Sequence, residues 1–291
     1  MEVVRAPTAS EFLELTSSFR AAHPYGTNVI GSVALSILTG LRTYDDQFWW
    51  MVRKGNQVIG LAMRTPPHGL LLGPGSPGVG AALAHAVLDR DPDLPSVNGP
   101  TDLAQEFCDI MAERGEKRAT QIALREFVQV VDRLIVPTIV GCCRVANIGD
   151  ESMVLEWGRA FAADVAMPVW SDDGLRATLR AGQIYLWIVD GEPVSMAGHA
   201  VPVPFPTFSV ARVGPVYTPA QRRGHGYAAA VTAAVTTLLQ GAGHRVMLLT
   251  DATNATSNGV YRRLGYEVVA ELTKVDFLNV ELSPMSMGQP A

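Results

Sequence analysis

The sequence predicts a mixed α/β (α+β) protein of two domains, each with a mostly antiparallel sheet flanked by helices. The chain has 291 residues, which is long for one hydrophobic core and fits two domains of ordinary size. Residues 183–218 contain short apolar runs separated by tight turns, the pattern of consecutive antiparallel strands. Residues 49–63 align without a gap with residues 185–199, which indicates an internal duplication. The predicted domains are residues 1–138 and residues 139–291.

The C-terminal half has the clearer elements. Its predicted helices carry apolar residues at helical spacing, and its predicted strands are short apolar runs bounded by turn residues. In chain order we expect a buried strand (141–146), two helices (153–165 and 171–182, the second capped by Ser171), three strands (183–190, 193–203 and 207–218), a helix that begins after Gly226, a buried strand (245–252), a short helix (256–265) and a strand or strand pair (266–277).

The N-terminal half repeats this order less distinctly. We expect a strand pair (48–63), a strand that ends in Gly-Pro (68–74), a helix (79–91), a short strand (96–99) and a second helix (101–115). Residues 118–137 are predicted to form a further helix, which ends near Pro137 and links or braces the two domains.

Composition excludes several classes of protein. A hydrophobic fraction of 48% argues against global disorder, and a net charge of −5 argues against binding dominated by nucleic-acid phosphates. The cysteines Cys108, Cys142 and Cys143 have no repeating spacing, which argues against a disulfide framework or a metal site. No apolar run is long enough to span a bilayer. We therefore expect a cytoplasmic protein with no metal, nucleic-acid or membrane partner, and the oligomeric state stays open.

The stretch QRRGHGYA (residues 221–228) directly precedes an Ala/Val-rich helix. It is either a simple turn or an anion cradle, because a helix N-terminus exposes unpaired N–H groups that glycine lets a phosphate approach. A P-loop is excluded, since GxxxxGK followed by Ser or Thr is absent. A Rossmann fingerprint, with Asp251 holding a ribose, conflicts with the antiparallel strands predicted before the helix.

Two motifs together resemble the acyl-CoA site of the GNAT superfamily of N-acyltransferases. The signature R/Q-x-x-G-x-G/A matches residues 223–228, and an overlapping match begins at Gln221. The resemblance covers roughly residues 141–277, whereas the N-terminal half resembles the degenerate first copy of tandem GNAT proteins. Its equivalent stretch, GSPGVGAAL (residues 75–83), keeps glycines but has no arginine. The second motif follows in the expected order and comprises Asn254, Asn258, Tyr261, Gly265 and Tyr266.

The resemblance implies that acetyl-CoA is a co-substrate. Its pyrophosphate would rest on the N–H groups at the start of the helix, and its pantetheine arm would lie where strand 207–218 splays from strand 245–252. Tyr261 matches the family's tyrosine that protonates the leaving sulfur, and a backbone N–H near Val216 to Thr218 would stabilise the oxyanion. The residues that the resemblance assigns to cofactor binding are Val216, Tyr217, Thr218, Arg222, Arg223, Gly224, His225, Gly226, Tyr227, Ala228, Asn254 and Asn258.

The sequence does not identify a general base. Many GNAT enzymes carry a glutamate on the strand before the pyrophosphate loop, but that strand has no carboxylate here. The remaining candidates are His199, Asp251, Glu156 and Glu192. Of these, His199 has the side chain that ordinarily titrates nearest neutral pH, and Glu192 lies in a predicted hairpin turn.

Two functions remain open at this point. The first is an enzyme that moves an acetyl group from acetyl-CoA to a primary amine on a small molecule by direct attack. The alternative is a non-catalytic acyl-CoA binding or sensing module, which the missing strand carboxylate favours. Tyr261 favours the enzyme, and the acceptor cannot be read from the sequence.

Overall fold

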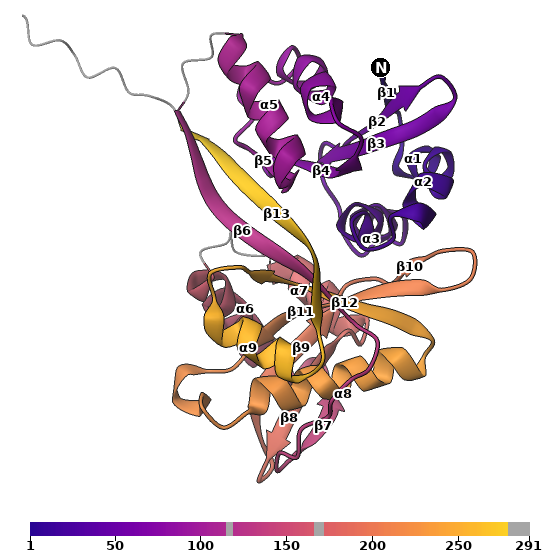
Figure 1. Ribbon diagram of the computed structural model, residues 1–291. Coiled ribbons are helices and arrows are strands. Elements are labelled where there is room, and N and C mark those ends of the chain that lie inside the picture. The colour runs from indigo at the N-terminus through magenta and orange to yellow at the C-terminus, as the bar shows by residue number, and fades with distance from the viewer. Residues whose placement is uncertain (115–118, 166–171, 279–291) are drawn as a thin grey trace, which may run out of the picture.

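The protein consists of two halves with the same order of elements, joined through one continuous sheet (Figure 1). The computed structural model describes residues 1–114, 119–165 and 172–278. Ser171, the predicted helix cap, lies outside the described residues. The prediction of a mixed α/β fold, with a largely antiparallel open sheet and flanking helices, is confirmed.

The N-terminal half runs from a strand through three short helices into a strand meander, and then alternates helices and strands. Its elements are β1 (Glu2–Ala6), α1 (Ala9–Leu15), α2 (Ser17–Ala22), α3 (Asn28–Leu38), β2 (Phe48–Lys54), β3 (Gln57–Arg64), β4 (Leu70–Gly75), α4 (Val79–Leu88), β5 (Ser96–Pro100), α5 (Thr101–Glu113) and β6 (Ala119–Val131).

The C-terminal half repeats that order, with a short additional strand in the meander. Its elements are β7 (Cys142–Val145), η1 (Ile148–Asp150), α6 (Glu151–Asp164), α7 (Asp172–Arg180), β8 (Ile184–Val189), β9 (Glu192–His199), β10 (Val203–Pro204), β11 (Ser209–Tyr217), η2 (Ala220–Arg222), α8 (Tyr227–Gly241), β12 (His244–Asp251), α9 (Ala255–Arg263) and β13 (Glu267–Leu278). The predicted strand at 141–146 is present, but β7 is a largely exposed edge strand rather than a buried one.

One prediction is wrong, because residues 119–131 form strand β6 and not a helix. The sequence from Thr120 to Val131 contains Leu, Arg, Gln and Glu, which favour helices, beside Thr, Ile, Phe and Val, which favour strands. The tertiary environment decides between them: β6 lies between β12 and β13, and both of its edges are paired with those strands. Local preference cannot reveal a partner that lies more than 100 residues away in the chain.

The two halves exchange their last strands. The sheet order is β1-β2-β3-β4-β5-β13-β6-β12-β11-β9-β8-β7, so β13 of the C-terminal half pairs with β5, and β6 of the N-terminal half pairs with β12. Between them, β6 and β13 pair over a long antiparallel stretch, from Glu267↔Val130 to Leu278↔Ala119. Figure 1 shows these two strands spanning the space between the halves. The domain boundary at residues 138 and 139 therefore stays a prediction, because strands from both sides share one sheet.

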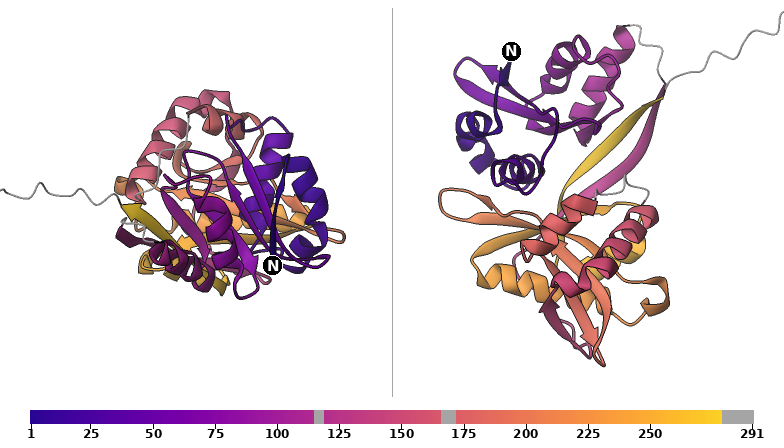
Figure 2. Two further views of the ribbon diagram at one scale, coloured as in Figure 1. Left: turned by 90° about the horizontal axis from the view of Figure 1, so that it is seen from above. Right: turned by 180° about the vertical axis from the view of Figure 1, so that it is seen from behind.

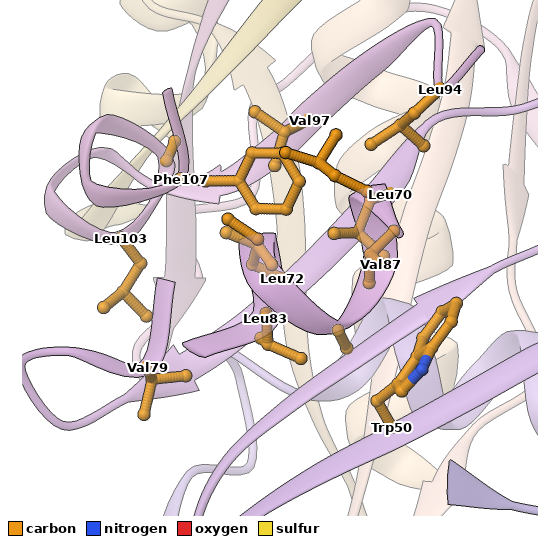
Figure 3. Packing of buried hydrophobic residues seen from close by; sticks show 14 of the residues in the cluster. Trp50, Leu70, Leu72, Val79, Leu83, Val87, Leu94, Val97, Leu103 and Phe107 are labelled. Atoms are coloured by element: carbon orange, nitrogen blue, oxygen red, sulfur yellow. The ribbon is translucent and has the colours of Figure 1, made fainter. Parts of the chain in front are cut away.

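Each half packs helices on both faces of its sheet. In the N-terminal half, α4 and α5 cover a core that includes Leu83, Phe107 and Leu72 (Figure 3), and α1 and α3 cover the opposite face around Trp49. In the C-terminal half, α8 and α9 lie on one face, and α6 and α7 lie on the other (Figure 2). Burial of apolar side chains on both faces is what holds each layered half together.

The strand exchange predicts that an apolar side chain near the C-terminal end of β13 stabilises the N-terminal half. Phe277 stacks on Phe107 of α5 with ring centroids 6.2 Å apart, and it is 7% exposed. We expect Phe277→Ala to lower the free energy of unfolding by about 3–5 kcal/mol, measured by urea denaturation. The neighbouring Leu278, which is 44% exposed, provides the control variant Leu278→Ala. Equal effects of the two variants would show that β13 is not part of the N-terminal core.

Candidate functional site

The two central parallel strands of the C-terminal half separate at their carboxyl ends. Strands β11 and β12 pair from Ser209↔His244 to Val213↔Leu248, and no further pair joins them, although β11 continues to Tyr217 and β12 to Asp251. The splay that the resemblance implies is therefore present in the structure. Beyond Val213, no strand of the described residues pairs with the backbone of β11 on this side, which leaves polar groups for an added ligand to pair with.

A bulge shapes the end of β11. The register with β9 shifts between Val213 and Val216, at the point where Gly214 adopts a φ of 146°. The end of the strand is then fixed by Ser195, whose hydroxyl bonds the Tyr217 carbonyl at 3.0 Å and the Thr218 hydroxyl at 2.8 Å. Bulges re-aim the backbone next to binding sites, and this one lies where the resemblance expects the oxyanion donor.

The turn after β11 presents backbone donors to solvent. Gly224 and Gly226 have φ values of 83° and 80°, the left-handed region that glycine adopts without strain. No side chain caps α8, and no described residue accepts a hydrogen bond from the backbone N–H groups of residues 224–229. Residues 224–226 are exposed. The geometry is therefore that of an anion cradle at a helix N-terminus.

The two arginines of the turn differ in their contacts. The Arg223 guanidinium donates to the Thr218 carbonyl at 3.0 Å and to the Asp164 carboxylate at 2.5 Å, so it braces the turn against α6. Arg222 is exposed, and none of the described side chains pairs with it. The ring of His225 stacks on Tyr227 and bonds the Arg223 carbonyl at 2.9 Å. Of these side chains, Arg222 is the cation left to meet an anion in the cradle.

The two asparagines of the second motif have structural contacts. The Asn254 side chain caps α9 by accepting from the Ser257 N–H at 3.0 Å. Asn258 accepts from the Thr250 hydroxyl at 2.7 Å and donates to the Asp251 carbonyl at 2.9 Å, so it ties α9 to the end of β12. Their predicted role in CoA binding stays a prediction, and these contacts position the helix that carries Tyr261.

Tyr261 lies on α9, against the apolar cluster beneath α8. Its ring meets Tyr266 edge to face at 5.9 Å. Burial raises the pKa of Tyr261 to about 12, so the phenol is protonated at neutral pH. In the part of the chain that the structure describes, its hydroxyl has no hydrogen-bond partner, whereas the Tyr266 hydroxyl bonds Thr236 at 2.7 Å. Tyr261 is thus the tyrosine of the pair with a proton to give.

The candidate bases named from the sequence have ordinary structural surroundings. Glu156 and Glu192 are exposed. The Asp251 carboxylate accepts from the N–H and hydroxyl of Thr253 in a turn. His199 bonds the Ala200 carbonyl at 2.9 Å, and burial lowers its pKa. Sequence reasoning missed Glu126, because the sequence predicts a helix over residues 118–137. It lies on β6 directly opposite Asp251.

The N-terminal half contains an equivalent cradle that is already filled. Helix α4 begins after Gly78, which has a φ of 88°, as α8 begins after Gly226. The carboxylate of Glu106 on α5 accepts from the N–H of Gly78 at 2.8 Å and from the N–H of Gly80 at 2.9 Å. A Cβ at Gly80 would lie 2.2 Å from the Leu103 carbonyl oxygen, so the two helices are in close contact here. The N–H groups at the start of α4 are therefore satisfied by a carboxylate of the protein itself.

The comparisons with known proteins agree with this geometry. Residues 185–275 match the family described as FR47-like protein, and no curated protein matches the chain. A GCN5-related N-acetyltransferase from Sphaerobacter thermophilus is 14% identical, with 94% of this chain and 95% of that chain covered and a TM-score of 0.60.

Two further solved structures are similar over nearly their whole length. A tandem GNAT protein from the clavulanic acid biosynthesis pathway is 16% identical, with 94% and 98% coverage and a TM-score of 0.54. A Drosophila protein is 13% identical, with 95% and 98% coverage and a TM-score of 0.68. The chain therefore has the fold of these GNAT structures, and the fold that the resemblance implies is confirmed.

Two kinds of feature are absent from the described residues. No helix among them is both long and apolar enough to cross a bilayer. No three His, Cys, Asp or Glu side chains within the described ranges gather in a group that would hold a metal ion.

The filled cradle predicts that Glu106 stabilises the fold. In Glu106→Ala the N–H groups of Gly78 and Gly80 lose their charged acceptor, and we expect the free energy of unfolding to fall by about 1.5–3 kcal/mol. Glu113→Ala removes an exposed glutamate from the same helix and serves as the control. Chemical denaturation measures both. A loss in Glu106→Ala no larger than in the control would contradict the assignment.

Proposed function

We propose that this protein is an N-acetyltransferase that moves an acetyl group from acetyl-CoA to a primary amine of a small molecule by direct attack. The proposal rests on one observation: three features lie together at one end of the sheet. They are the splay beyond Val213, the unpaired N–H groups of residues 224–229 and the protonated Tyr261. Acetyl-CoA, a thioester that carries a nucleoside diphosphate, suits all three features.

The cradle residues fit a pyrophosphate. A Cβ added at Gly224 would have no atom within 4 Å, so the space in front of the backbone is open. At Gly226 the φ of 80° disfavours any side chain, and a Cβ would also lie 2.8 Å from the Cδ1 atom of Ile139, which would have to shift. The partial positive charge at the start of α8 and the Arg222 guanidinium both favour an anion at this position.

The chemistry required of the protein follows from acyl transfer to an amine. The carbonyl oxygen of the thioester gains negative charge as the amine attacks, and a backbone N–H near Val216 to Thr218 would stabilise it. The carbon–sulfur bond then breaks, and the sulfur accepts a proton from the Tyr261 hydroxyl. The hydroxyl group has the required proton because burial holds its pKa far above neutrality.

The second candidate function is a non-catalytic acyl-CoA binding or sensing module. The observation in its favour is the lack of a carboxylate on β11, between Ser209 and Tyr217. The two functions differ in one measurable respect: an enzyme releases CoA thiol from acetyl-CoA faster when an amine is added, and a sensor does not. Thiol release with a panel of polyamines, amino acids and aminoglycosides tests this directly.

The cradle predicts that acetyl-CoA stabilises the folded protein. At a ligand concentration near 100 times Kd, we expect a gain of about 2.7 kcal/mol, seen as a rise in Tm. Gly226→Glu should abolish the rise, because it fills the cradle and adds like charge to it. Gly243→Glu places the same residue at the other end of α8, at a φ of 85°, and should retain the rise. An unchanged response in Gly226→Glu would place the pyrophosphate elsewhere.

The unpaired hydroxyl predicts a specific effect of Tyr261→Phe. We expect kcat to fall by roughly one to three orders of magnitude in steady-state assays, with little change in acetyl-CoA affinity. Since the phenol is protonated at every pH below its pKa of about 12, the wild-type rate should show no loss from this group up to about pH 11.

Tyr266→Phe is the matched control for this variant. The Tyr266 hydroxyl bonds Thr236 within the core, so its loss should lower stability and leave kcat nearly unchanged. If both phenylalanine variants keep full activity, Tyr261 is a packing residue and not the acid.

A further inference from the structure

The face of the C-terminal sheet that turns toward the N-terminal half carries charged residues beside the splay. Side chains of paired residues share one face of a sheet, and Arg212 is paired with Met247, which packs in a cluster with Val210 and Tyr25 of the N-terminal half. Ala211 and Val213, one position before and after Arg212, point to the opposite face, beneath α8. Arg212 thus lies on the face toward the N-terminal half, immediately before the splay.

Glu126 reaches the same face from the exchanged strand. It is paired with Asp251, and Leu249, two positions earlier on β12, packs in the same cluster as Met247. Pairing of β6 with β12 therefore places a carboxylate of the N-terminal half at the end of β12. The strand exchange supplies, from the other half, the carboxylate that β11 lacks.

The surroundings of Glu126 suit a proton acceptor. The Asn98 amide donates to its carboxylate at 3.5 Å. Burial raises the pKa of Glu126, while Asn98, Arg212 and Lys274 favour the ionised form and Asp251 opposes it. The Oδ1 atom of Asn98 is buried and has no partner among the described residues. An ammonium or amine group has the N–H donors that both oxygen acceptors require.

Within the described ranges, no carboxylate forms a hydrogen bond or ion pair with Arg212. Its guanidinium donates to the Asn28 Oδ1 atom and to the Ser32 hydroxyl of α3, each at 3.3 Å, and both are neutral. Burial and, to a smaller extent, Arg42 lower the pKa of Arg212 to about 10, although Glu126 partly offsets them. A buried guanidinium held only by long bonds to neutral groups is costly, and a carboxylate satisfies it best through two parallel bonds.

We propose that the acceptor is a small amine that also carries a carboxylate, with Arg212 binding the carboxylate and Glu126 acting as the general base. This inference rests on the proposed function. The acceptor enters on the face toward the N-terminal half, and Tyr261 acts from the face beneath α8. Both halves of the chain then contribute to one reaction centre, because Glu126, Asn98 and the residues that hold Arg212 come from the N-terminal half.

The proton balance of this reaction closes without a further reagent. Glu126 takes one proton from the ammonium, and the neutral nitrogen forms a bond to the thioester carbonyl carbon. The carbon–sulfur bond breaks, the sulfur receives the Tyr261 proton, and the second proton lost by nitrogen returns to the tyrosinate. The products are the amide and CoA thiol, and the proton on Glu126 passes to solvent.

Matched acceptors test the role of Arg212. Glycine, leucine and γ-aminobutyrate are each compared with their primary amide, with CoA thiol release as the readout. For the productive pair we expect kcat/KM of the carboxylate form to exceed that of the amide about 30- to 1000-fold. Arg212→Gln should reduce this ratio to near one, and Arg212→Lys should restore part of it. The Tm rise with acetyl-CoA, unchanged in both variants, shows that they are folded.

A variant of the base completes the experiment. Glu126→Gln should lower kcat about 10²- to 10⁴-fold and remove the fall in rate at acidic pH, because the wild-type rate falls as Glu126 is protonated. Saturation-transfer NMR with CoA present, on whichever of glycine, leucine and γ-aminobutyrate is turned over, should show binding in wild type and Glu126→Gln but not in Arg212→Gln.

Two results would overturn the inference in different ways. Equal turnover of amides and carboxylates, in a protein that binds and uses acetyl-CoA, would refute the carboxylate acceptor and leave the proposed function intact. A protein that shows no Tm rise with acetyl-CoA and no thiol release would refute the proposed function, and with it this inference.

Discussion

The antiparallel pairing of β6 with β13 is the constraint on which the rest of the structure depends. It joins the two sheets into one, and it delivers the last strand of each half to the sheet of the other. Without it, β5 and β12 would each present an unpaired edge, and the N-terminal core would lose Phe277. The same pairing brings Glu126 opposite Asp251, at the open end of the parallel strands β11 and β12. The pairing of β6 with β13 thus shapes both the joined sheet and the open end of β11 and β12.

The two helix N-termini show how similar backbones can differ in what their N–H groups contact. Both α4 and α8 begin after a glycine in the left-handed conformation, at Gly78 and Gly226. In the first copy Glu106 occupies the helix N-terminus, and its helix packs closely against Gly80. In the second copy the donors of residues 224–229 have no partner among the described residues. The two helix N-termini therefore differ by a single carboxylate on a neighbouring helix. Where it is present, the N–H groups are already bonded, and where it is absent, they can accept an external anion.

Sequence reasoning predicted the elements whose signals are local. Alternating apolar runs placed β8, β9 and β11, and the glycines of residues 224–226 marked the start of α8. The resemblance to a known family predicted the splay, and Tyr261 was found through that family's motif.

Sequence reasoning failed at β6, where Leu124, Arg125 and Glu126 also suit a helix and the deciding partners are distant strands. Because the sequence predicts a helix over residues 118–137, it does not place Glu126 at the end of β12. Arg212 gave no signal either, since its neutral partners, Asn28 and Ser32, come from the other half.

Hydrogen exchange of the backbone with and without acetyl-CoA tests the central claim most directly, because it distinguishes the two cradles within one molecule. The account predicts that acetyl-CoA slows exchange in a peptide covering residues 222–230 and leaves a peptide covering residues 76–82 unchanged. That second peptide should already exchange slowly without ligand, because Glu106 holds the N–H groups of Gly78 and Gly80. Protection that appears at residues 76–82, or none at residues 222–230, would contradict the account.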